Sequence, residues 1–83
     1  MSSDIESRVR RIIQEHGRLN VPASDLSMDV DLYSCGLTSH ASVSVMLALE
    51  GEFEIEFPDE MLSRSVFGSI RSISEAAEKL VRR

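Results

Sequence analysis

The sequence has 83 residues, of which 14 are acidic and 9 basic, so its formal net charge at pH 7 is −5. A chain this short forms one hydrophobic core, and we expect a single domain over residues 1–83. The acidic balance argues against nucleic acid as the main partner, because binding to phosphates needs a basic face.

The composition also limits which fold classes and which cellular compartments we expect. Cys35 is the only cysteine, so no internal disulfide can form, and with His16 and His40 it has no zinc-site spacing. The polar start predicts no signal peptide, and no apolar run has membrane-spanning length, so we expect a cytoplasmic protein that binds no membrane. The chain has no Trp, one Tyr and three Phe, and such an aliphatic core favours a helical bundle.

The first predicted helix runs from about Ser3 to His16. Ser3 with Glu6 forms a capping-box pattern, and Gly17 follows as a stop signal. Apolar residues recur at helical spacing, namely Ile5, Val9, Ile12 and Ile13.

Residues 18–38 lack helical periodicity and predict a long first loop. A structureless loop of this length is unusual in a compact domain, so we expect its apolar side chains to pack it down, with a short helical turn. Those side chains are Leu19, Val21, Leu26, Val30, Leu32 and Leu37. The acidic residues Asp25, Asp29 and Asp31 are expected to face water.

A central helix is predicted from Ser39 to about Gly51, with Glu52 and Phe53 as a possible last turn. It is apolar around most of its circumference, so we expect it to be the most buried helix. Ser39 follows the turn at Gly36 and has two interpretations. Its hydroxyl either caps the helix or carries a covalent modification, since a phosphate there meets the positive end of the helix dipole. From the residues alone the cap is the simpler interpretation.

In the second half we expect an extended connector in which Phe53, Ile55 and Phe57 are buried. A short helix is predicted at residues 59–62. A turn anchored by Val66, Phe67 and Ile70 follows it. Ser72 with Glu75 forms a second capping-box pattern, which predicts a last helix from Ser72 to about Val81. The fold class is therefore all-α, a four-helix bundle of three long helices and one short. No hydrolase triad, phosphate-binding loop or metal motif appears.

Several sequence pieces around Ser39 form a recognisable pattern. They are Asp31-Leu32, Gly36-Leu37-Thr38-Ser39-His40, the run Leu49-Glu50-x-x-Phe53-x-x-x-Phe57-Pro58-Asp59, and Phe67 with Ile73. With the helix layout, this pattern resembles the acyl and peptidyl carrier proteins over almost the whole chain. Those are small acidic four-helix domains that carry 4′-phosphopantetheine on a serine at the start of their second helix.

The resemblance implies that Ser39 accepts the arm from coenzyme A through a separate phosphopantetheinyl transferase. The thiol of the arm then holds an acyl or aminoacyl group as a thioester, and the chain itself is not an enzyme. The familiar fatty-acid carriers have Asp-Ser-Leu at this site and a strongly acidic second helix. Here Thr38 and His40 flank the serine, and Ser42 and Ser44 take positions that are often acidic.

These departures suggest a dedicated partner and resemble the stand-alone bacterial carriers that a relative of seryl-tRNA synthetase charges with an amino acid. An aminoacyl cargo loaded by an amino acid:carrier protein ligase is thus implied. The alternatives are a conventional fatty-acid or polyketide carrier served by acyl-transferring enzymes, and a helical interaction module whose serine is never modified. An enzyme is disfavoured because His40 adjoins Ser39 but lies off its helix face.

We expect a monomer, with candidate partner contacts around the serine at Leu37, Thr38, His40, Val43 and Met61. The acidic run from Glu50 to Glu60 is either a solvated face or a docking surface for basic partner residues. Cys35 is expected to be a half-buried thiol. Three methionines are expected to fill the core rather than line an acyl tunnel, namely Met28, Met46 and Met61.

Overall fold

A computed structural model describes the backbone of residues 2–82 and the side chains of residues 4–82. In this range the chain forms four α-helices and three short 3₁₀ helices, and the described backbone contains no strand. In chain order these are α1 (Ser2–His16), η1 (Ala23–Asp25), η2 (Leu32–Cys35), α2 (Ser39–Phe53), η3 (Asp59–Met61), α3 (Arg64–Phe67) and α4 (Ile70–Val81). The predicted all-α class, with three long helices, one short helix and a long first loop, is confirmed.

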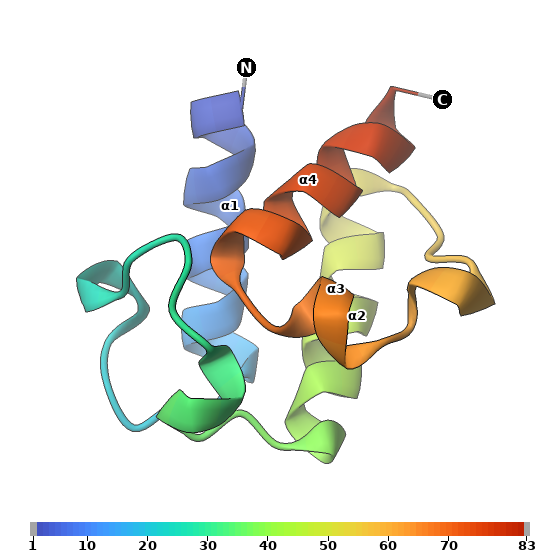
Figure 1. Cartoon of the computed structure of the whole chain (residues 1–83). Helices are drawn as coiled ribbons and strands as arrows, with labels where there is room; N and C mark the ends of the chain where they lie inside the picture. The colour runs from blue at the N-terminus through green and yellow to red at the C-terminus, as the bar shows by residue number, and fades with distance from the viewer. Residues whose placement is uncertain (1, 83) are drawn as a thin grey trace.

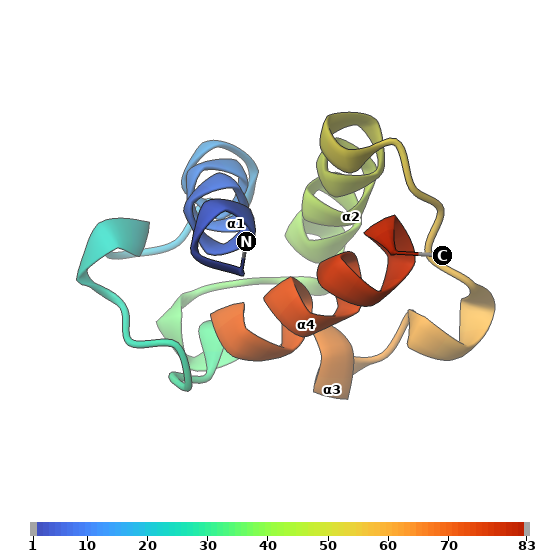
Figure 2. The same ribbon diagram turned by 90° about the horizontal axis from the view of Figure 1, so that it is seen from above.

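Helices α1 and α2 run antiparallel, and α4 lies across one side of this pair (Figure 1 and Figure 2). The core between them is mainly aliphatic, because each helix turns one apolar stripe inward. Its largest fully buried side chains are Val9, Ile13, Leu32, Val45, Leu49, Ile70 and Ile73. One aromatic pair joins this core, since the ring centroids of Phe57 and Phe67 lie 5.4 Å apart.

The first helix matches its predicted range within one residue. It begins at Ser2 and ends at His16, where the Gly17 N–H donates to the Ile13 carbonyl at 2.8 Å. The predicted capping role of Ser3 lies outside the described side chains. Glu6 instead forms an ion pair with Arg10 at 2.9 Å.

The long first loop is packed down largely as predicted. Leu26, Leu32 and Leu37 are buried, whereas Val21 is 40% exposed, so its predicted packing is wrong. The guanidinium of Arg10 donates to the carbonyls of Ala23 and Leu26 at 2.8 and 2.7 Å, which ties η1 to α1.

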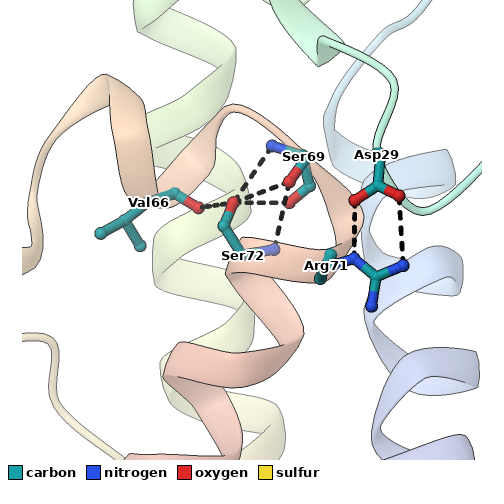
Figure 3. Close-up of polar contacts among 5 residues, drawn as sticks. All are labelled: Asp29, Val66, Ser69, Arg71 and Ser72. Carbon is teal, nitrogen blue, oxygen red and sulfur yellow. Dashed lines mark hydrogen bonds and ion pairs between the residues drawn. The ribbon is translucent and has the colours of Figure 1, made fainter.

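Two main-chain hydrogen bonds join the loop to the start of α4. The Leu32 N–H donates to the Gly68 carbonyl at 2.7 Å, and the Arg71 N–H donates to the Met28 carbonyl at 2.9 Å. The three loop aspartates face water as predicted, but Asp29 also accepts two hydrogen bonds from Arg71, at 2.6 and 3.1 Å (Figure 3). These hydrogen bonds lower the pKa of Asp29.

The expectation that α2 is the most buried helix is wrong. It buries Ala41, Val45 and Leu49, whereas Val43 and Leu47 are 50% and 57% exposed. Neighbouring helices cover only one face of α2, so an apolar circumference does not become a buried one. The helix also continues past Gly51 to Phe53 and ends where Glu54 adopts the left-handed conformation.

The predicted start of the last helix is also wrong. Helix α4 begins at Ile70 with Ser69 as its cap, three residues before the predicted Ser72 cap. Ser69 Oγ accepts from the Ser72 N–H at 3.1 Å, while Ser72 Oγ accepts from the Ser69 N–H and donates to the Val66 carbonyl at 2.7 Å (Figure 3). Ser72 therefore belongs to a capping box as its third helical residue and not as its cap.

The helical turn predicted at residues 59–62 is present, but the short α-helix follows later in the chain. Residues 59–61 form only one 3₁₀ turn, and the short α-helix is α3, at the place where a turn was expected. Phe67 of α3 is buried against Phe57, which anchors the helix to the core. None of the helices in the described part is long and apolar enough to cross a bilayer.

Candidate functional site

A tight turn at Gly36 delivers the chain to the start of α2. Gly36 has φ 110°, a left-handed conformation that glycine adopts without strain. A Cβ at this position would also meet the side chain of Asn20 at 3.0 Å. The Asn20 N–H donates to the Cys35 carbonyl at 2.9 Å, which fixes the turn against the first loop. Cys35 itself is half-buried, as expected.

Thr38, not Ser39, caps α2. Its Oγ1 accepts from the Ala41 N–H at 3.0 Å, and its backbone is extended, as is usual for a cap residue. Ser39 is the first residue of the helix and is exposed. Its carbonyl accepts from Ser42 Oγ at 2.7 Å, but its own hydroxyl has no hydrogen bond within the described residues. The capping interpretation of Ser39 is therefore wrong, and its oxygen is free at the surface.

A cavity of about 350 Å³ opens beside Ser39. It lies between η2, α2 and α3, and its lining combines hydroxyl groups with an apolar floor. The lining residues are Tyr33, Ser39, Ser42, Val43, Met46, Leu62, Ser63, Arg64 and Phe67. The guanidinium of Arg64 lies over the ring of Tyr33, 4.3 Å from its centroid, so this cation is held at the edge of the cavity.

A second cavity of about 290 Å³ lies on the other flank of the α2 start, against the end of α1. Its lining is more polar than that of the first cavity and contains two histidines and one arginine. The lining residues are His16, Gly17, Arg18, Gly36, Thr38, His40, Ala41 and Ser44. No carboxylate lines this cavity or the first one.

Two members of the acidic run hold the fold together. Glu52 accepts from Arg8 at 2.7 Å and pairs with Arg11 at 2.9 Å, so α1 and α2 are joined at this end. The hydrogen bond from Arg8 is the main reason that the pKa of Glu52 is lowered. Glu50 accepts from the Phe57 N–H at 2.9 Å, which turns the connector back onto the helix. The remaining acidic residues of the run are exposed, namely Glu54, Glu56, Asp59 and Glu60.

The predicted contact residues do not all lie at the surface. Thr38 and His40 are exposed beside Ser39, and Val43 is half exposed one turn further along α2. Met61 is partly buried against the core. Leu37 is only 5% exposed and packs into the core, which argues against its predicted role as a partner contact.

Sequence reasoning missed the residues that complete the two cavities. Tyr33, Arg64 and Arg18 lie far from one another along the chain, and no local pattern brings them to Ser39. Met28 and Met46 both pack against the core, and Met46 also lines the first cavity. Within the described part, no group of three or more His, Cys, Asp or Glu residues is placed to hold a metal ion.

Comparison with known proteins gives a consistent match. Residues 7–79 match the family model described as the phosphopantetheine attachment site. The chain is 38% identical over 77 residues to the aminoacyl carrier protein of Agrobacterium fabrum strain C58, covering 93% of both chains. It is 26% identical to aminoacyl carrier protein 1 of Bradyrhizobium diazoefficiens, covering 87% of this chain and 80% of that one.

Solved structures match equally well. In a crystal structure of engineered Bradyrhizobium japonicum glycine:[carrier protein] ligase with AMP and a carrier protein from Agrobacterium tumefaciens, the matching chain is 40% identical. The match has a TM-score of 0.85 and covers 88% of this chain and 97% of that one. A protein of Agrobacterium tumefaciens known in solution is 38% identical, with a TM-score of 0.74 and 93% coverage of both chains.

Proposed function

Because the chain belongs to the phosphopantetheine attachment-site family, we propose that Ser39 carries its 4′-phosphopantetheine arm and that an amino acid is the cargo. The observation that most directly supports Ser39 as the attachment site is that a different residue caps α2. Thr38 caps the helix, and the neighbouring Ser39 hydroxyl is exposed and has no hydrogen bond within the described residues.

The local structure fits a phosphodiester on Ser39. The N–H groups of Ser39 and His40 belong to the first turn of α2, which leaves them without a partner inside the helix. The positive end of the helix dipole adds to their attraction for a negative group. No carboxylate lines either cavity that flanks the helix start, so no nearby negative charge opposes it.

The chain supplies the attachment oxygen and a surface, and a phosphopantetheinyl transferase supplies the chemistry. Ser39 has no base in hydrogen-bond contact within the described part, so its activation is assigned to that separate enzyme. Once attached, the arm supplies a terminal thiol that holds the cargo as a thioester. The chain acts as a single-domain monomer that presents this thioester to its partners and catalyses no step itself.

The amino acid cargo rests on the relatives. Two relatives are aminoacyl carrier proteins, and a matching carrier was crystallised with a glycine:[carrier protein] ligase. We therefore assign loading to an amino acid:carrier protein ligase. A fatty-acyl cargo is the alternative, because the cavity beside Ser39 has an apolar floor that includes Met46 and Phe67.

Intact-mass spectrometry tests the attachment site. After incubation with coenzyme A and a phosphopantetheinyl transferase, the protein should gain the mass of one phosphopantetheine group. Ser39→Ala should abolish the gain. Ser42→Ala changes another serine of the same helical turn and should keep it. A wild-type protein that gains no mass with several transferases would contradict the proposal.

The cargo is tested on the loaded protein. With ATP and a glycine:[carrier protein] ligase, the arm should gain glycine in a bond that hydroxylamine cleaves. With ATP, a fatty acid and an acyl-carrier synthetase, the arm should gain little fatty acid. The reverse result would favour the fatty-acyl alternative and leave the attachment at Ser39 intact.

A further inference from the structure

We propose that the surface around Ser39 docks a partner protein whose contact face presents carboxylates around an apolar centre. Arg18 and Arg64 are the cations that fix its docked position. The inference rests on the proposed function for the identity of the partner, the amino acid:carrier protein ligase. Of the two alternatives given for the acidic run after α2, it favours the solvated face over the docking surface.

The first observation is the absence of charge along the segment that presents Ser39. From Leu32 to Leu49 the chain contains no Asp, Glu, Lys or Arg. A protein with 14 acidic residues thus keeps every carboxylate off this segment, and its two flanking cavities are also lined by none. A partner with a basic contact face would find no carboxylate on this segment or in the lining of the two cavities.

The second observation concerns which cations are free to bind a partner. Four arginines are engaged in ion pairs with carboxylates of the same chain, namely Arg8, Arg10, Arg11 and Arg71. Arg18 and Arg64 are exposed and make no ion pair within the described residues. They line the two cavities on opposite flanks of the α2 start, so they bracket Ser39.

An exposed apolar patch adjoins Ser39 and Arg64. Val43, Leu47 and Leu62 are 50%, 57% and 45% exposed, and no described element covers them. Val43 and Leu62 line the same cavity as Ser39, and Leu47 follows Val43 by one helical turn. Burial of such side chains supplies affinity, whereas charges at the rim select the partner and fix its orientation.

The net negative charge of the chain does not prevent this docking. Of the free carboxylates of the acidic run, Glu54 and Glu56 follow the end of α2 that is opposite Ser39, and Asp59 and Glu60 belong to η3, which lies beside α2 (Figure 1). None of the four lines a cavity that flanks Ser39. At physiological salt, charges separated by more than about 8 Å are largely screened. The charges in direct contact with the partner therefore decide the binding.

The experiment measures the loading kinetics of holo-protein with the Bradyrhizobium glycine:[carrier protein] ligase. Arg18→Gln combined with Arg64→Gln should raise KM for the carrier by about 2- to 30-fold, the range expected for two exposed ion pairs, with kcat unchanged. Lys79→Gln with Arg82→Gln is the matched control. It removes the same charge from unpaired cations near the end of α4, away from Ser39, and should leave KM unchanged.

Further variants distinguish the effect of the Arg64 charge on KM from the effect of its packing. Arg64→Lys should keep KM near the wild-type value, whereas Arg64→Glu should raise it more than Arg64→Gln does. The difference between wild type and the double variant should shrink in 1 M salt, at which the Debye length is about 3 Å. Equal effects of Arg64→Lys and Arg64→Gln would assign the residue to packing on Tyr33 and overturn its role as a docking charge.

Glu54→Gln with Glu56→Gln tests the competing surface. We expect no rise in KM, since these residues lie away from Ser39. A rise there with no effect of the arginine variants would overturn the proposal, as would failure of the wild-type holo-protein to bind the ligase. The mass gain at Ser39 is measured first on every variant, so failure of attachment is distinguished from failure of docking.

Discussion

Replacing Thr38 and replacing Ser39 should have separate consequences, although the two residues are adjacent. Thr38→Ala removes the Oγ1 that accepts from the Ala41 N–H at 3.0 Å. Loss of such a cap lowers the free energy of unfolding by about 1 kcal/mol. In a domain of this size, that loss lowers Tm by roughly 4–8 °C. Ser39→Ala removes a hydroxyl with no described partner, so its effect should stay within about 0.5 kcal/mol.

Thermal denaturation followed by circular dichroism measures the first effect on the unmodified proteins. Thr38→Ser is the matched control, because it keeps the capping oxygen and should keep most of the stability. Intact mass after treatment with the transferase measures the second effect. Thr38→Ala should still gain the arm, whereas Ser39→Ala should not. If Ser39→Ala lost as much stability as Thr38→Ala, the assignment of the cap to Thr38 would be refuted.

Three further predictions concern stability, each measured by chemical denaturation. Ser74→Ala should raise the free energy of unfolding by about 1 kcal/mol, because its buried hydroxyl has no partner within the described residues, whereas Ser72→Ala should lower it by about 1–3 kcal/mol. The reverse order would contradict the described network. Glu52 has a lower pKa folded than unfolded, so its stabilisation is present above the ordinary glutamate value of about 4.3 and is lost as the pH falls through its folded pKa. In Glu52→Gln the free energy of unfolding should therefore fall less as the pH is lowered than it does in the wild type. An unchanged pH dependence would refute the role of the Glu52 ion pairs. Leu32→Ala should cost about 2–5 kcal/mol, because Leu32 is fully buried, and a loss below about 1 kcal/mol would contradict its place in the core.

Periodic patterns predicted the helices well, and cap positions less well. Ile5, Val9 and Ile12 mark the inner face of α1, and its bounds follow within one residue. At the start of α2, two adjacent hydroxyl residues could each serve as the cap. The choice depends on the backbone of a single residue, which the sequence does not reveal. The same ambiguity among closely spaced serines moved the predicted cap of α4 by three residues.

The surroundings of Ser39 could not be predicted, because they depend on how the helices pack. An acidic run resembles a solvated face, and only the antiparallel alignment of α1 with α2 brings Glu52 to Arg8. Likewise, the exposure of Leu47 follows from which face of α2 remains uncovered. Arg64 reaches the ring of Tyr33 only because α3 lies against η2 in the folded chain.

The two main-chain hydrogen bonds between the first loop and the α4 region depend on no side-chain chemistry. The hydrogen bonds themselves exclude only proline from their donor positions, because proline has no N–H, although the Leu32 side chain is needed separately in the core. The acceptor for the Arg71 N–H is the Met28 carbonyl, so a change of the Met28 side chain leaves this connection between the loop and α4 in place. The turn at Gly36 and the exposed Ser39 that follows it are thus supported in part by main-chain contacts that a change of side chain does not remove.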